Sequence, residues 1–276
     1  MNQKLKLLIK RTIPKKHLSQ LIDLYIRYRY FLRGLLYIGD KFECPFCQGH
    51  FRKFLSTGLD IPVLREKNVV GAGYRLNAIC PRCNSTDRER LIYLYLKNTT
   101  NILYENLKIL HIAPERNLQK VLMSNPNINY LSVDINPPLA TAKMDITNIE
   151  YEDNLFDVII CNHVLEHIQD DRKAMSELYR VLKPCGRAIL QVPISLSFNK
   201  TYQDAKVLSP EEREKAFGQS DHVRIYARDY KNRLEKVGFS VKVYSLTKEF
   251  GESLTHKYGL LKDENIYICS KPKDQK

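Results

Sequence analysis

From residue 105 onward the sequence alternates short apolar runs with amphipathic stretches, and this pattern limits the chain to few folds. Residues 170–182 and 226–237 place their apolar side chains on one helical face. The runs with the character of buried strands lie at residues 109–113, 130–133, 158–161, 188–192, 239–244 and 266–269. Strands that alternate with helices form a parallel sheet covered by helices on both faces. We therefore expect an α/β domain with a doubly wound sheet over residues 105–276.

Two segments carry the sequence signature of a helix start. Ser209-Pro210-Glu211-Glu212 combines a capping serine, a proline at the first helical position and a capping-box glutamate. Ser85-Thr86-Asp87 is followed by Glu89 at the capping-box spacing and then by apolar residues at helical positions. We expect helices to begin at both places, the earlier one linking an N-terminal region to the α/β domain.

Composition and the first residues exclude several classes of protein. The 276 residues are 43% hydrophobic and 27% charged, which are ordinary globular values and exclude a disordered or low-complexity chain. No run approaches the roughly 18 apolar residues that a membrane span requires. Lysine and arginine interrupt the first 16 residues, so that no apolar core remains for a secretory signal. We expect a cytoplasmic protein.

The net charge of +13 is concentrated at the N-terminus. Residues 1–40 contain nine Lys and Arg against two Asp, so one seventh of the chain holds more than half of the excess. Apolar residues such as Leu21, Leu24 and Tyr25 alternate with these charges at roughly helical spacing. One interpretation of this basic amphipathic arm is a surface helix that packs an apolar face on the main body. In the other, the arm is peripheral to an anionic membrane surface or contacts an acidic partner.

Four of the seven cysteines form two matched pairs, Cys44-Pro45-Phe46-Cys47 and Cys80-Pro81-Arg82-Cys83. An odd number of cysteines without an export signal argues against a disulfide framework. Two such knuckles complete the tetrahedral sulfur site that zinc prefers, and four thiolates leave no open position. We therefore predict a structural zinc ion bound by Cys44, Cys47, Cys80 and Cys83 in a zinc-ribbon module over residues 41–104; a redox dithiol or chance spacing are the alternatives. The lone cysteines are expected to be ordinary buried residues: Cys161, Cys185 and Cys269.

Polar side chains follow the expected strands at the edge where doubly wound sheets bind ligands. Asp134 lies 21 residues after Ala113, the spacing at which a carboxylate accepts hydrogen bonds from the two hydroxyls of a ribose. Asp145 is placed to receive an adenine amino group, with Ile146 covering the face of the base. The sequence therefore favours a nucleoside ligand.

The run from Phe156 to Pro193 resembles the type 11 group of class I S-adenosylmethionine-dependent methyltransferases. Its most specific parts are Phe-Asp-Val-Ile-Ile-Cys-Asn-His-Val-Leu-Glu-His-Ile at 156–168 and Arg-Val-Leu-Lys-Pro-Cys-Gly-Arg-Ala-Ile-Leu-Gln-Val-Pro at 180–193. The resemblance covers about residues 105–272. It implies a Rossmann-like, seven-stranded sheet whose last strand is antiparallel, with residues 239–244 and 265–270 as the final pair.

The same resemblance implies S-adenosyl-L-methionine as the cofactor and assigns residues to it. Asp134 would contact the ribose with Ile135 beside it, Asp145 and Ile146 the adenine, and the segment Asn162–His163 the methionine part. Together with the twin knuckles, His111-Ile112-Ala113-Pro114-Glu115 and Asp221-His222-Val223-Arg224 are similar to a bacterial subgroup of zinc-ribbon methyltransferases.

The turn after the first strand departs from the pattern of that family. Most class I methyltransferases have an acidic residue and a Gly-x-Gly-x-Gly turn there. Here His111 replaces the acid, and Ala113, Glu115 and Asn117 replace the glycines. Glycine lets the backbone approach a cofactor, and Pro114 also removes a backbone donor. We expect His111, Ala113 and Glu115 still to bind the cofactor, with Glu115 accepting a hydrogen bond from its ammonium group.

The segment Asp221-His222-Val223-Arg224 carries the predicted catalytic residues, because the topology places it on the ligand side of the sheet. Methyl transfer to a hydroxyl is helped by a general base, and histidine has a suitable unperturbed pKa. We predict His222 as the base, Asp221 as its orienting partner and Arg224 as a cation that binds the acceptor. A polar loop that caps the following helix is the alternative. His163 and His167 are further candidate bases, for which packing or helix capping is the favoured interpretation.

The sequence says least about the methyl acceptor. Asn162 is not followed by the Pro-Pro-aromatic sequence of amino-methylating DNA and glutamine enzymes, which disfavours an exocyclic amine of that type. The mixed charge of residues 196–224 suits a polar small molecule or a glycan, and we expect O-methylation of such an acceptor. An RNA methyltransferase is less favoured, because the cysteine module lacks aromatic-rich basic clusters. A non-catalytic zinc-containing binding protein is the third hypothesis, motivated by the degenerate first turn.

Overall fold

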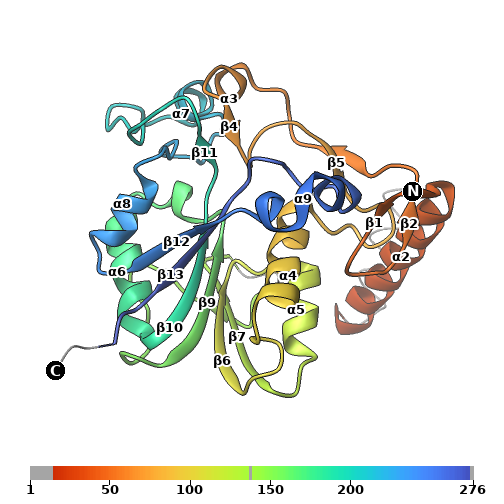
Figure 1. The fold of residues 1–276 in the computed structure, drawn as a ribbon, viewed down its shortest axis with the longest axis horizontal. Coiled ribbons are helices and arrows are strands. Elements are labelled where there is room, and N and C mark those ends of the chain that lie inside the picture. The colour runs from red at the N-terminus through yellow and green to blue at the C-terminus, as the bar shows by residue number, and fades with distance from the viewer. Residues whose placement is uncertain (1–14, 137–138, 274–276) are drawn as a thin grey trace.

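The computed structural model describes residues 15–136 and 139–273, and a seven-stranded sheet lies at its centre (Figure 1). The strands follow the order β12-β13-β10-β9-β6-β7-β8. Their bounds are β6 Leu107–Ile112, β7 Ile128–Asp134, β8 Ala142–Lys143, β9 Phe156–Asn162, β10 Leu182–Gln191, β12 Ser240–Tyr244 and β13 Ile266–Ser270. The expectation of a seven-stranded α/β sheet is confirmed.

The last strand reverses the direction of the sheet. β6 pairs in parallel with β7 and β9, and β9 pairs in parallel with β10. β13 is antiparallel to both β10 and β12, so the predicted final pair is also confirmed. As a result, the N-terminal end of β13 lies at the same edge of the sheet as the carboxyl ends of the parallel strands.

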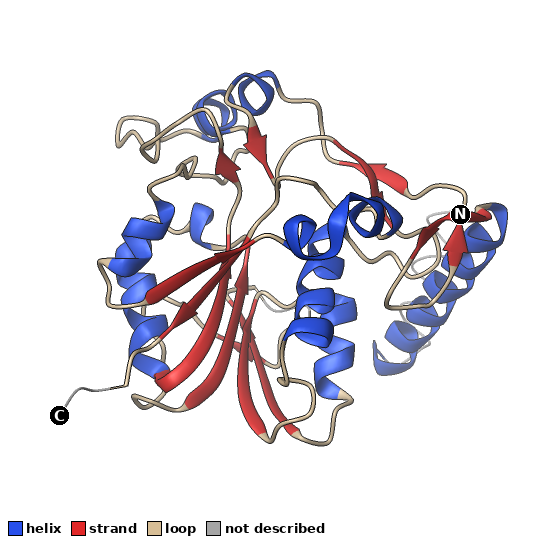
Figure 2. Ribbon diagram, viewed as in Figure 1, coloured by secondary structure: helices blue, strands red, loops and turns tan. Residues whose placement is uncertain are grey.

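Helices cover both faces of the sheet, as Figure 2 shows. Leu94 of α4 (Asp87–Thr99) and Leu118 of α5 (Arg116–Met123) belong to the hydrophobic core of one face. Leu178 of α6 (Asp171–Val181) and Leu234 of α8 (Tyr230–Glu235) belong to the core of the other face. The last helix, α9 (Leu246–Lys257), precedes β13. The sheet is therefore buried on both sides, which is why its strands read as continuous apolar runs.

Helix boundaries agree with the capping signals but not everywhere with the periodicity. Thr86 and Ser209 each form a capping box, and they begin α4 and α7 (Pro210–Phe217). α8 is shorter than the expected helix over 226–237. Tyr226, the first residue of the expected helix, forms a β-bridge with Ile194, and Ile225 just before it bridges Tyr202, so pairing with other segments competes with the helix there.

The N-terminal region consists of one long helix and short antiparallel ribbons. Its elements are α2 Lys15–Leu36, β1 Ile38–Glu43, β2 His50–Phe51, β3 Leu55–Thr57, α3 Pro62–Glu66, β4 Val69–Val70 and β5 Arg75–Ile79. β1 pairs with β2 and β3 pairs with β5. β4 instead pairs with β11 (Ile194–Ser195), which follows β10. Residues between β3 and β5 are therefore attached to the carboxyl edge of the central sheet (Figure 1).

Arg90 of α4 joins the cysteine region to the α/β domain. Its guanidinium is fully buried and donates hydrogen bonds to the carbonyls of Ala78 and Ser85 on one side. On the other side it donates to the carbonyls of Tyr258 and Gly259, after α9. A buried cation satisfied by carbonyls from both regions fixes them against each other, because removing either set would leave the charge unpaired.

The expectation that Cys185 is a buried residue is wrong. Cys161 and Cys269 are buried in the sheet, as expected, but Cys185 is exposed. It lies within β10, where the pairing with β9 shifts register between Leu182 and Arg187, and has φ +64°, a left-handed conformation that favours glycine. At this irregularity the side chain is directed to solvent instead of the core.

Part of the predicted basic arm lies outside the described residues, namely Lys4, Lys6, Lys10 and Arg11. The rest forms α2, whose apolar side chains are largely exposed from Leu21 onward. Among the described helices, none is both long enough and apolar enough to cross a bilayer.

Candidate functional site

The four paired cysteines bring their sulfur atoms together. All four Sγ atoms lie within 4.8 Å of one another. The Cys44–Cys83 separation is 3.5 Å and the Cys47–Cys80 separation is 3.7 Å. Tetrahedral zinc with Zn–S bonds of about 2.3 Å places its sulfur ligands about 3.8 Å apart. The four residues therefore have the chemistry and spacing of a tetrahedral metal site.

The two cysteine pairs have the same backbone geometry. Gln48 N donates to the carbonyl of Cys44, and Asn84 N donates to the carbonyl of Cys80. Gln48 and Asn84, each directly after the second cysteine, both have left-handed φ angles. Ser85 Oγ lies 3.3 Å from the sulfur of Cys44. Two matching turns of this kind are what a closed structural site requires, because each presents two sulfur atoms to one point.

A second candidate site lies where the order of the strands reverses. The chain leaves β6 through α5 to β7 on one side and later returns to β9 on the other side of β6. Such a switch point leaves a crevice at the carboxyl ends of the strands, where ligands bind. The predicted cofactor-binding residues should therefore lie at or just after the ends of β6, β7 and β9.

Glu115 bridges the switch point. Its Oε2 lies 2.8 Å from His111 Nε2 on β6, and its Oε1 accepts a hydrogen bond of 3.0 Å from Asn162 Nδ2 at the end of β9. His111 Nδ1 in turn lies 2.9 Å from the hydroxyl of Tyr130. Burial alone would raise the pKa of Glu115, but the hydrogen bond and charge of His111 lower it below its usual value. Glu115 is therefore an ionised acceptor at the crevice.

Side chains take the place of the expected glycines in the first turn. Ala113 adopts φ +46°, so the backbone still takes a left-handed step without a glycine. Glu89 of α4 accepts hydrogen bonds from the backbone and the side-chain amide of Asn117, at 2.9 and 3.3 Å. Burial raises the pKa of Glu89. An α4 residue thus organises the first turn of α5.

The predicted nucleoside-binding residues lie at the end of β7 and just after β8, at the carboxyl edge of the sheet. Asp134 ends β7, is partly exposed, and accepts a hydrogen bond from Asn136 N. Ile135 is exposed beside it. Asp145 is exposed and accepts from the backbone and hydroxyl of Thr147. Ile146 differs from the expectation: it is buried in the core under the sheet, so it has little surface left to cover a base.

His163, directly after β9, lies between two carboxylates. It adopts φ +54°, with Nδ1 3.4 Å from Glu166 Oε1 and Nε2 3.7 Å from Glu264 Oε1. Gly71 (φ +82°) lies against this pair, since a Cβ there would be 3.0 Å from Glu264 Oε1. Within the described ranges, both ring nitrogens of His163 and the Oδ1 of Asn162 are buried with no hydrogen-bond partner. Buried polar atoms without partners are costly, and their clustering indicates a binding site.

The predicted catalytic segment reaches this cluster, but with different pairings. Glu166, His167 and His222 bring one ligand atom each within 4.8 Å of one another, a group that could also hold a metal ion. Asp221 pairs with His167, not with His222: its Oδ2 lies 3.2 Å from His167 Nδ1. The rings of His167 and His222 are in edge-to-face contact, 4.6 Å apart. Burial lowers the pKa of His222 to about 4, which keeps its imidazole neutral.

Arg224 does not face an open space as an acceptor-binding cation would. The side chain is buried and donates to the carbonyls of Leu165, Ile168 and Gln169. These residues form and follow the short helix η1 (Leu165–His167), which carries two members of the cluster. Arg224 therefore positions the segment that holds Glu166 and His167.

Three residues of this edge were missed by the sequence analysis. Glu166 stands inside the quoted motif, Glu264 precedes β13, and Arg88 is the second residue of α4. Arg88 donates to the carbonyl of Gly71, and its charge helps to lower the pKa of the buried Glu264 carboxyl. The antiparallel direction of the last strand was a usable signal, since it places the residue before β13 at the ligand edge. Nothing in the sequence pattern pointed to Arg88.

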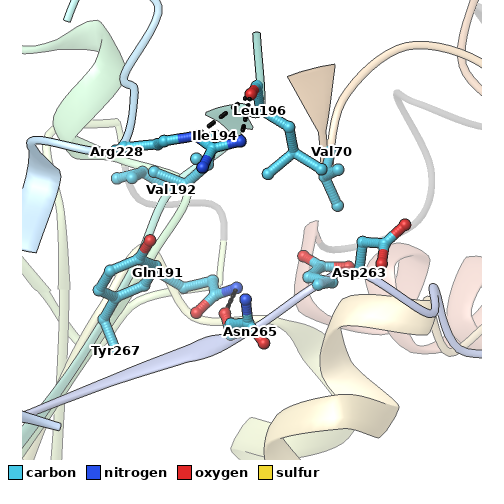
Figure 3. A pocket seen from close by; sticks show the side chains of 10 residues that line it. Val70, Gln191, Val192, Ile194, Leu196, Arg228, Asp263, Asn265 and Tyr267 are labelled. Carbon is cyan, nitrogen blue, oxygen red and sulfur yellow. Dashed lines mark hydrogen bonds between the residues drawn. The ribbon is translucent and has the colours of Figure 1, made fainter. Parts of the chain in front are cut away.

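Two cavities open at this edge, each walled partly by the N-terminal region. Figure 3 shows one of about 280 Å³, where Val70 of β4 faces Gln191, Asp263 and Tyr267. The Nε2 of Gln191 donates to the carbonyl of Asn265, which holds its side chain along the wall (Figure 3). The other cavity, of about 410 Å³, is lined by charged groups that include Arg75, Arg88, Glu214 and Asp221.

Comparisons with known families agree with the resemblance found in the sequence. Residues 115–190 match the family model described as a methyltransferase domain. The demethylmenaquinone methyltransferase of Streptomyces avermitilis is 39% identical over 54 residues, which are 20% of this chain and 23% of that protein. The phosphoethanolamine N-methyltransferase 2 of Caenorhabditis elegans is 29% identical over 133 residues, 44% of this chain and 26% of that protein. The chain thus spans about a quarter of the length of these curated relatives.

Solved structures resemble the chain at lower identity. The crystal structure of the [4+2]-cyclase SpnF has a TM-score of 0.48 and 14% identity, covering 79% of this chain and all of that one. The phosphoethanolamine N-methyltransferase 2 of Haemonchus contortus, solved with S-adenosyl-L-methionine, has a TM-score of 0.46 and 17% identity, over 69% of this chain and 53% of that one.

Proposed function

We propose, from the class I S-adenosylmethionine-dependent methyltransferase domain that this chain contains, that the protein transfers a methyl group to a hydroxyl of a polar small molecule or glycan. One observation carries the proposal. Acceptor oxygens suited to the cofactor lie on Glu115 and Asn162 at the switch point, and a histidine cluster is built partly on the segment that follows Asn162. This arrangement supports a methyl donor bound at the first group and a proton acceptor supplied by the second.

The residues present fit S-adenosyl-L-methionine. Asp134 supplies a carboxylate at the end of β7 for the ribose hydroxyls, and Asp145 follows β8 for the adenine amino group. The ionised Glu115 and the buried Oδ1 of Asn162 are both acceptors, as an ammonium group requires. Asn162 Oδ1 has no partner among the described residues. When bound, the cofactor supplies a methyl group on a sulfonium sulfur.

The chain's own groups are proposed to position the acceptor and receive its proton. His222 and His167 are the candidate bases, and Asp221 holds the ring of His167 by its Nδ1. His222 is neutral and able to accept a proton, although its lowered pKa makes it a weaker base than an ordinary histidine. Arg224 is a positioning residue, because it fixes the backbone that carries His167. Orientation of the two reactants contributes most of the acceleration in this kind of reaction.

The cysteine cluster is proposed to hold structural zinc. Its four sulfur atoms leave no position for a substrate, so its role is to shape the module. The module contributes to the reaction through Glu89, Arg88 and the cavity walls between β3 and β5. The site is therefore completed by both regions of the chain.

The two named relatives point to other classes of methyl acceptor. One is a demethylmenaquinone methyltransferase and the other a phosphoethanolamine N-methyltransferase, so a quinone and an amine are the competing acceptors. The mixed charge of the 410 Å³ cavity beside Asp221 supports a polar acceptor.

The first experiment is calorimetric titration of the full chain with S-adenosyl-L-homocysteine. We expect saturable binding by the wild type and at least a tenfold weaker affinity for Asp134→Ala, because a charge-assisted ribose contact is lost. Asp153→Ala, which removes an exposed carboxylate paired with Arg180, is the matched control and should bind like the wild type. Absence of binding by the wild type would favour a non-catalytic protein.

The second experiment uses a labelled methyl donor with glycan and metabolite extracts, quinone precursors, amines and RNA. Label in a hydroxyl of a polar acceptor supports the proposal. Label in RNA, with binding that falls steeply as salt rises, would support the RNA alternative instead.

A further inference from the structure

One face of α2 is an uninterrupted apolar stripe. Its side chains recur at intervals of three and four residues, and each is 41–72% exposed. The stripe consists of Leu21, Leu24, Tyr25, Tyr28, Phe31, Leu32, Leu35 and Leu36. Single exposed apolar residues are ordinary, but a contiguous stripe along four turns of helix is a mark of an interaction surface.

Arginines border the stripe on both sides. With 3.6 residues per turn, Arg27 and Arg29 lie about 100° to either side of Tyr28, which is near the middle of the stripe. The guanidinium of Arg29 lies 5.7 Å from the ring of Tyr25. Long basic side chains at the margins of an apolar face can extend toward anionic headgroups while their stems stay on apolar surface.

The opposite face of α2 is fixed to the cysteine cluster. Arg33 donates to the carbonyl of Pro81 in the second knuckle at 2.7 Å, and to Oδ1 of Asn84 directly after that knuckle at 3.1 Å. Gly34 packs closely on Arg82, since a Cβ at Gly34 would lie 2.9 Å from that of Arg82. Figure 1 shows α2 at the margin of the molecule, beside β1 and β2 and apart from the central sheet. The attachment of α2 to the second knuckle therefore determines which face of α2 is exposed.

We propose that the stripe of α2 lies on an anionic lipid surface. Charge complementarity selects this occupant over a second copy of the chain, because two copies would bring the bordering arginines together. Residues 1–14, which precede the helix, add Lys4, Lys6, Lys10 and Arg11 to the same positive charge. Leucine and phenylalanine suit the acyl boundary of a bilayer, and the tyrosines suit its headgroup layer.

The test is co-sedimentation of the full chain with vesicles. We expect binding to phosphatidylcholine vesicles that contain phosphatidylglycerol, weak binding to phosphatidylcholine alone, and a loss of binding as salt rises. Leu24→Ser/Phe31→Ser should weaken the partition by about tenfold or more. Arg27→Gln/Arg29→Gln should weaken it by roughly thirtyfold on anionic vesicles only, at about 1 kcal/mol for each arginine.

Matched controls change the same kinds of residue elsewhere. Leu76→Ser/Leu208→Ser alters two exposed leucines off the helix, and Lys242→Gln/Lys248→Gln alters two exposed lysines. Both should bind like the wild type. Unchanged metal content and an unchanged affinity for S-adenosyl-L-homocysteine show that each variant is folded.

Three outcomes would overturn the proposal. The first is no binding to anionic vesicles by the folded wild type. The second is equal binding by the wild type and the stripe variant. The third is a dimer in solution that the stripe variant dissociates, which would assign the stripe to a second copy.

Discussion

The described residues 15–136 and 139–273 contain two clusters of metal-capable side chains, and they are built in opposite ways. Cys44, Cys47, Cys80 and Cys83 come from two four-residue turns, whereas Glu166 and His167 meet His222 from a loop 55 residues further on. Each cluster brings its ligand atoms within 4.8 Å of one another. The first is made by local turns that a spacing rule describes, and the second only by the packing of η1 against the segment before α8.

The clusters also differ in what they leave open. In the cysteine cluster every side chain faces the other three, which suits a closed structural site. In the second cluster Glu166 Oε2 is buried without a hydrogen-bond partner in the described part of the chain, and Asp221 is 67% exposed beside a cavity. Unsatisfied and accessible groups indicate a site that meets a ligand. We therefore predict that the cysteine cluster stabilises the fold and that the histidine cluster acts on a ligand, and mutations should distinguish the two roles.

The largest expected effect is on stability, from Cys44→Ser. Structural zinc sites contribute apparent binding free energies of roughly 10–16 kcal/mol, so losing one ligand should release the metal and unfold the module. Thermal unfolding and metal analysis measure the result. Cys185→Ser, at an exposed cysteine outside the cluster, should leave both unchanged. A metal-free wild type with the same stability would refute the structural role.

The next effect is on turnover, from His222→Asn. If His222 takes the acceptor proton, methyl transfer should fall by about 10²–10⁴-fold, while product binding stays at the wild-type value. The contrast with Cys44→Ser is that stability should change much less than rate. His50→Asn, at an exposed histidine, is the matched control. If the His222 variant keeps the wild-type rate, His222 is not the base, and His167, which pairs with Asp221, is the remaining candidate.

The pH dependence of folding stability should identify the histidine cluster without an activity assay. The pKa of His222 is about 4 in the folded protein, below the ordinary 6.5, because burial penalises the charged ring. The unfolded chain therefore binds more protons between these pH values, and stability should fall as the pH drops from about 6.5 to about 4. The expected loss is up to about 3 kcal/mol. Denaturant unfolding measures this. The free energies of unfolding of the wild type and of His222→Asn should change differently with pH in this window and in parallel above it.

The smallest effect is expected from Asp221→Asn. The carboxylate is mostly exposed, and its contact with His167 orients a ring without burying a charge. Turnover should fall by roughly tenfold through misorientation, with stability unchanged, as exposed pairs contribute little. A KM-against-kcat analysis would show whether the loss lies in kcat, as orientation of the base requires.

Most of the fold could be read from the sequence. The apolar runs identified six of the seven strands, and the capping boxes at Thr86 and Ser209 marked two helix starts. The sequence missed β8, a two-residue strand with no apolar run. It overestimated α8, because bridges formed by Ile225 and Tyr226 compete with the helix. Local periodicity cannot report a partner from another part of the chain.

The candidate site was predictable only in part. Asp134, Glu115 and Asn162 could be placed because they follow strands, and the ends of parallel strands share an edge. The pairing of Asp221 with His167 and the turn of Arg224 toward three carbonyls could not, since side-chain direction depends on packing. Glu264 comes from the segment before the last strand and Arg88 from α4, and their meeting at one edge is a property of the whole fold.

The sequence by itself determined the parallel sheet, the two cysteine turns and the acidic residue after β7, because each is specified by neighbours a few residues away. The tertiary structure alone decided that β4 joins β11, that Glu89 organises the first turn of α5, and that Asp221 orients His167. The physical reason is the distance along the chain over which each interaction acts. Hydrogen bonds within a turn are fixed by local geometry, whereas contacts between remote segments follow from burial of the whole core.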